Sequence, residues 1–219
     1  DSWMVNTSNV YLHLNLAYIR IVQLQQTNDT NLLRSYVELF NFLLQKFKFL
    51  ATPATTLDMH LFNAVLYRME GNWLEMRKSL EECLALSEYK AFNRFTIQAL
   101  HFDLLVKENN LVAAGNIMQE VKIQPQFNLV YQPDKAGWAI RKAYLFYALL
   151  AENGLKAIEQ FTPEYKDRID INAIQHSCRA ITKDKQGYNA MLLQIRIQLM
   201  MEHHMGELHH EAENMRVYY

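Results

Sequence analysis

Glycine and proline are scarce in this chain, which has only 6 glycines and 4 prolines among its 219 residues. Sheet proteins of this length need more turn residues, so the shortage favours long helices over strands. None of the six glycines belongs to a G-x-G-x-x-G, G-x-x-x-x-G-K or G-x-S-x-G pattern, so the sequence offers no loop that would cradle a phosphate. We therefore predict an all-α chain without a nucleotide-binding loop.

Long apolar runs and a strong net charge are also absent. The longest apolar run, near residues 143–151, is far shorter than the roughly 20 residues that span a bilayer. The formal net charge is -1, so there is no electrostatic argument for binding nucleic acid or an anionic membrane. We expect no signal peptide and a cytoplasmic protein in which this segment contacts neither membrane nor nucleic acid.

The chain has only two cysteines, Cys83 and Cys178, and both lie in segments with a helical apolar pattern. This placement predicts buried free thiols in a reducing compartment, in preference to an extracellular disulfide. His176 lies two residues before Cys178, and side chains at that spacing on a helix point in different directions. We therefore expect no catalytic residue, no cofactor and no enzymatic activity.

Apolar residues recur at helical spacing along the whole chain, and half of all residues are apolar. The predicted helices cover about 9–26, 31–50, 56–70, 73–86, 90–107, 111–121, 134–152, 154–161, 172–181, 188–203 and 206–219. Thr52 and Pro53 predict a break, and residues 127–131 predict a short extended piece or a packed loop. Asn72 with Glu75 predicts a capping box, and Asp134 is predicted to cap the helix that follows it.

Two amphipathic helices around Gly71 and Asn72 form the clearest helical hairpin, at residues 56–87. This hairpin resembles the tetratricopeptide repeat, a helix-turn-helix unit of 34 residues. The matching residues are Ala64, Tyr67, Gly71, Trp73, Leu80 and Cys83, whereas Met76 departs from the alanine that the family prefers. Looser copies of this hairpin have their turns near Asn109, Asn153 and Gly206. Residues 181–201 also look like part of a group of uncharacterised bacterial helical-repeat proteins.

The resemblance implies a right-handed array of antiparallel helical hairpins, an α-solenoid, that binds its partner in a concave groove. We expect residues 1–219 to form a single helical-repeat domain with a soft boundary at 122–133, in a longer protein whose array continues past Tyr219. The expected partner is a protein or peptide segment. The family's groove positions fall on Asp58, Arg68, Asp103 and Lys107, and a later helix adds Arg141 and Tyr147.

Two other functions stay open on the sequence alone. One is a regulatory or sensor module of a larger bacterial transcription regulator, with the DNA-binding part elsewhere. The other is a metal-binding helical bundle, because His203, His204, His209 and His210 lie close together with several glutamates. Glu207 and His210 make one Glu-x-x-His step, whereas a di-iron bundle needs two, so we predict no metal site. The oligomeric state is left open.

Overall fold

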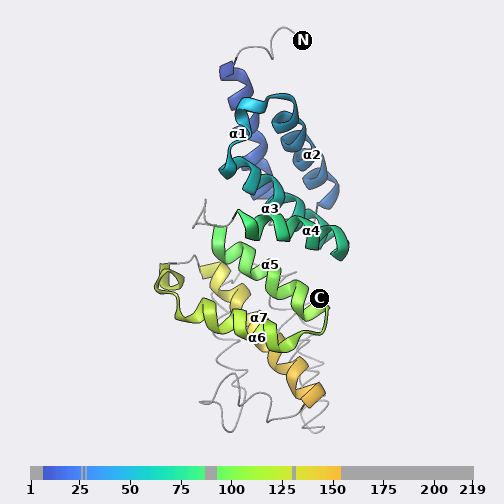
Figure 1. The fold of residues 1–219 in the computed structure, drawn as a ribbon, viewed down its shortest axis with the longest axis vertical. Coiled ribbons are helices and arrows are strands. Elements are labelled where there is room, and N and C mark those ends of the chain that lie inside the picture. The colour runs from blue at the N-terminus through green and yellow to red at the C-terminus, as the bar shows by residue number, and fades with distance from the viewer. Residues whose placement is uncertain (1–6, 26, 28, 87–92, 130–131, 154–219) are drawn as a thin grey trace, which may run out of the picture. The chain divides into compact units, whose positions relative to one another are not determined.

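The computed structural model describes residues 7–25, 27, 29–86, 93–129 and 132–153. They form seven α-helices and two short 3₁₀ helices, without a β-strand (Figure 1). The prediction of an all-α chain is confirmed for this part. The predicted helices after residue 153, the bacterial-like stretch 181–201 and the His203–His210 cluster lie outside it.

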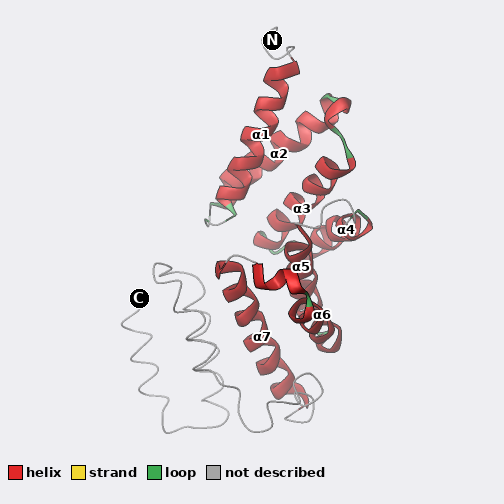
Figure 2. Ribbon diagram, turned by 90° about the vertical axis from the view of Figure 1, so that its left-hand side faces the viewer, coloured by secondary structure: helices red, strands yellow, loops and turns green. Residues whose placement is uncertain are grey.

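The seven helices follow one another with short connections (Figure 2). They are α1 (Thr7–Leu24), α2 (Thr30–Lys46), α3 (Pro53–Met69), α4 (Trp73–Ala85), α5 (Arg94–Lys107), α6 (Leu111–Ile123) and α7 (Gln132–Asn153), with 3₁₀ helices η2 (Lys48–Leu50) and η5 (Pro125–Leu129). Residues 125–129 are therefore a 3₁₀ turn, not the extended piece that the sequence left open, and none of them is buried.

The chain divides into two compact units, residues 1–104 and 105–219. The division falls within α5, and the soft boundary expected at residues 122–133 stays a prediction. In the first unit, α1 packs on α2, α2 on α3, and α3 on α4. Each of these helices thus packs against the next one in the chain.

Helix α3 contributes to two hydrophobic cores, one on each side. Phe62 and Leu66 face α1 and α2, and the Phe62 ring meets Tyr18 and Phe40 edge-on, with ring centroids 5.2 Å apart in both pairs. The other side of α3 packs on α4 and on the first part of α5. Its buried residues are Leu57, Leu61, Ala64 and Val65, beside Met76, Leu80, Cys83, Ile97, Leu100 and Leu104. Since burial of large apolar side chains is the main source of stability, α3 is central to the first unit.

The turn between α3 and α4 uses Gly71 and Asn72 to end one helix and begin the next. Gly71 has φ 71°, its N–H donates to the carbonyl of Arg68 at 3.1 Å, and the N–H of Asn72 donates to Tyr67 at 2.8 Å. These two bonds are the Schellman motif, which needs a left-handed residue after the helix. The Asn72 side-chain oxygen then accepts from the N–H of Glu75 at 3.3 Å, which caps α4.

The turn between α5 and α6, in the second unit, repeats this geometry. Asn109 has φ 59°, its N–H donates to Val106 at 3.0 Å, and the N–H of Asn110 donates to Leu105 at 2.8 Å. The Asn110 side chain accepts from the N–H of Ala113 at 3.3 Å and caps α6. Asparagine tolerates the left-handed region better than most residues, so Asn109 stands where the first turn has glycine. The two turns are thus built in the same way, 38 residues apart.

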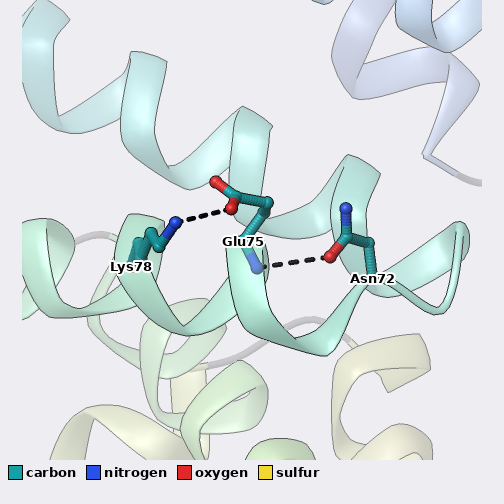
Figure 3. A network of polar contacts seen from close by, with 3 residues as sticks. All are labelled: Asn72, Glu75 and Lys78. Atoms are coloured by element: carbon teal, nitrogen blue, oxygen red, sulfur yellow. Dashed lines mark hydrogen bonds and ion pairs between the residues drawn. The ribbon is translucent and has the colours of Figure 1, made fainter.

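Three predicted helix ends are corrected by the structure. The capping box at Asn72 is only half formed, because the Glu75 carboxylate binds the Lys78 ammonium group at 2.6 Å (Figure 3). A complete capping box forms instead at Thr52 and Thr55. Asp134 does not cap α7, because that helix begins at Gln132, before Asp134.

The segment predicted as a break is therefore the start of α3. Thr52 has extended dihedral angles and caps the helix, and Pro53 is its first residue. Proline fits this position because its missing N–H would have no partner in the first turn of a helix. Helix α3 consequently begins three residues before the predicted start at Thr56.

Candidate functional site

Asp58, predicted to line a groove on α3, is buried with only 4% of its surface exposed. Its carboxylate accepts a hydrogen bond of 3.0 Å from the side-chain amide of Asn93, which is also buried. A buried carboxylate needs such a partner, because an unsatisfied charge away from water is costly. Asp58 therefore supports the packing of the first unit, and its position differs from that of an open groove residue.

Arg68 of α3 and Asp103 of α5, two of the predicted groove residues, form an ion pair in the structure. The guanidinium Nε lies 2.7 Å from an Asp103 carboxylate oxygen, and the side chains are 40% and 13% exposed, respectively. Ion pairs at such exposure contribute at most about 1 kcal/mol to stability, so this pair is only a minor contributor to the fold. It does place a mixed-charge group at the surface, linking α3 to α5.

A second ion pair was not predicted from the sequence. Arg34 of α2 lies 2.6 Å from the carboxylate of Glu70, which directly follows α3. The end of α3 therefore carries Arg68 and Glu70, two charged residues that pair with different helices. Arg34 and Glu70 are 36 positions apart in the chain, and no local sequence pattern connects them.

The remaining predicted groove residues belong to the second unit. Lys107 is the last residue of α5 and is exposed. Arg141 lies on α7, where its guanidinium carbon is 5.5 Å from the centre of the Trp138 ring, a cation–π contact. Tyr147 also belongs to α7, and its side chain is outside the described part.

Cys83 is a buried free thiol, as predicted, whereas Cys178 lies outside the described residues. Burial raises the pKa of the Cys83 thiol to about 12, and the nearby Asp58 and Glu82 carboxylates act in the same direction. Because the thiolate is the nucleophilic form, a thiol with this pKa is unreactive at neutral pH. Cys83 therefore functions as a small core residue.

Nothing in the described part of the chain forms a metal site. No group of three or more histidine, cysteine, aspartate or glutamate side chains among those residues is placed to hold a metal ion. His60 of α3 is partly buried, which lowers its pKa, and Glu82 opposes that shift. In the same part of the chain, no helix is long and apolar enough to cross a membrane.

Comparison with profiles of protein families, with curated proteins and with solved structures gives no match for this chain.

Proposed function

We propose that this chain is a helical-repeat scaffold, built from hairpins similar to tetratricopeptide repeats, that binds a protein or peptide segment. Two local features support the proposal. The turns at Gly71 and Asn109 share one hydrogen-bond pattern, and the hairpin residues Ala64, Leu80 and Cys83 are fully buried at the positions where the repeat packs its helices. Arrays of such hairpins generally serve as binding surfaces.

The Arg68–Asp103 pair is the observation that supports a binding surface on α3 and α5. These residues come from α3 and α5, which are the first helices of two successive hairpins, and the repeat lines its groove with such helices. Arg68 remains 40% exposed while it is paired with Asp103, so its guanidinium keeps donors for a further acceptor. A surface with both charge signs suits a peptide with acidic and polar groups better than a polyanion.

Capture of partners from native lysate, with the 219-residue chain as bait, tests this proposal. The Arg68→Glu variant is expected to capture at least tenfold less of a specific partner protein. The substitution reverses the charge presented to the partner and places a second carboxylate beside that of Asp103. The matched variant carries Arg68→Glu together with Asp103→Arg, which restores the internal ion pair with its charges exchanged. Its capture is expected to stay low, because the surface charge pattern is still reversed.

Full recovery of capture in the exchanged variant would contradict a contact by Arg68 and assign the residue to the fold alone. Equal capture by all three baits would exclude this surface. The Leu74→Gln variant, changed at an exposed position of α4, serves as a control that retains capture.

A further inference from the structure

Helix α1 is apolar on two opposite faces. Val10, Leu14, Ala17 and Ile21 face the core of the first unit and are nearly inaccessible to water. The opposite face carries Leu12, Leu16 and Ile19, whose exposed fractions are 53%, 49% and 50%. A helix places residues i, i+4 and i+7 on one side, so these three form a continuous ridge along the helix.

A group of aromatic side chains lies at the end of α1 that is beside η2. The Tyr11 ring is 5.8 Å from Phe49, and Phe49 is 6.1 Å from Phe47. The Lys46 ammonium group lies over the rings of Phe47 and Phe42, at 5.6 and 5.3 Å from their centres. Tyr11, Phe42 and Phe49 are each about half exposed. We call the ridge and these three rings, that is Tyr11, Leu12, Leu16, Ile19, Phe42 and Phe49, the outer surface of the first hairpin.

The charges around the outer surface are mostly positive. Helix α1 contains no acidic residue, and Arg20, Lys46 and Lys48 are all exposed. Within the described part of the chain, no carboxylate forms an ion pair with any of these three. Glu38, one turn before Phe42, is the acidic residue on this side of α2. The surface therefore has an excess of cations beside exposed aromatic rings.

We propose that the outer surface of the first hairpin docks an acidic amphipathic α-helix of another protein. The spacing of Leu12, Leu16 and Ile19 presents a ridge that fits between the side-chain rows of a second helix. An extended strand would need an exposed sheet edge, which a helical hairpin does not offer. The cations select acidic residues flanking the partner's apolar stripe. This proposal does not depend on the Arg68 surface, because it involves other residues and helices.

The probe for this test is a synthetic peptide of three identical heptads, with isoleucine and leucine at the two core positions and glutamate at the two flanking positions. At about 30 Å it matches α1 in length, and its glutamates prevent it from pairing with itself. Binding of the labelled peptide to the 219-residue chain is followed by fluorescence anisotropy, and saturable binding with a micromolar Kd is expected. A matched peptide with lysine in place of glutamate is expected to bind at least tenfold more weakly.

Variants then locate the peptide. The Leu16→Gln, Ile19→Gln double variant is expected to bind at least tenfold more weakly, and the Lys46→Glu, Lys48→Glu double variant should lose the preference for the acidic peptide. Leu74→Gln is the matched control, because Leu74 is 64% exposed on α4, away from the outer surface, and its affinity should stay within twofold. Unchanged far-UV circular dichroism and urea midpoint exclude a folding defect.

Three results would overturn the proposal. The first is no saturable binding of the acidic peptide, or equal binding by the Leu16→Gln, Ile19→Gln variant. The second is a dimer of the chain, seen by analytical ultracentrifugation and lost in that variant, which would assign the surface to a second copy. The third is sedimentation with phosphatidylserine vesicles, again lost in that variant, together with no peptide binding, which would assign it to a lipid surface.

Discussion

The first two hairpins contain similar helices but use their apolar residues differently. In α1 one apolar face is in the core and the opposite face is half exposed, whereas α3 is enclosed on two sides. After its first residue, Arg68 is the one exposed residue of α3. A helix that is apolar around its circumference therefore indicates neighbours on two sides. Within the described chain, α3 is covered on both sides, whereas α1 is covered on one.

The largest expected effect on stability is at Phe62, which packs from α3 against α1 and α2. Phe62→Ala should lower the free energy of unfolding of the first unit by about 3–5 kcal/mol, because it removes a ring that packs on Tyr18 and Phe40. Leu16→Ala, on the exposed face of α1, should change it by less than about 0.5 kcal/mol. Urea unfolding followed by circular dichroism measures both. Similar losses at the two positions would show that the outer face of α1 is covered in solution.

A smaller effect is expected at the two turns. Gly71→Ala should cost about 1–2 kcal/mol, because alanine is strained at φ 71° although a Cβ there would meet no atom within 4 Å. Asn109→Gly in the equivalent turn should change stability by less than about 0.5 kcal/mol, since both residues accept the left-handed region. Urea midpoints of the two variants separate these outcomes. Equal losses would mean that the two turns do not play the same role.

The smallest effect is a pH dependence at Cys83 of α4. Folding raises the pKa of this thiol from 9.0 to about 12, so the unfolded chain releases its proton first as the pH rises. The stabilising contribution is complete below pH 9 and decreases between pH 9 and 12, by about 1 kcal/mol at pH 10. Comparison of urea unfolding at pH 7 and 10 with that of Cys83→Ala, in a Cys178→Ser background, isolates this term. Rapid reaction of native Cys83 with a thiol reagent at pH 8 would contradict its burial.

Local patterns were sufficient to predict the positions of the helices up to residue 153. Gly71 followed by Asn72 marked a helix end and a cap, and both roles are present in the structure. Thr52 and Pro53 also indicate a helix boundary. A Thr-Pro pair can end one helix or begin the next, and here it begins α3, so the predicted start of this helix is too late. At Asn72 the cap was predicted correctly, whereas Lys78 binds the carboxylate that the capping box required.

Burial and long-range pairing could not be predicted from local sequence patterns. Asp58 was expected at a groove because the repeat pattern places a solvent-facing residue there. Its burial depends on Asn93, which lies 35 residues further along the chain and supplies the hydrogen bond. No local spacing encodes that partner. The ion pair of Arg68 with Asp103 likewise joins residues 35 positions apart, and no local spacing predicts it.

The double use of Asn72 and Asn110 has a consequence for how the chain tolerates change in length. Each asparagine closes one helix through its backbone and opens the next through its side chain, so no residue of the connection is spare. A single residue inserted near the start of α4 would rotate the part of that helix after it by about 100° and turn its apolar face away from α3. The turn at Asn72 therefore fixes the rotation of α4 relative to α3.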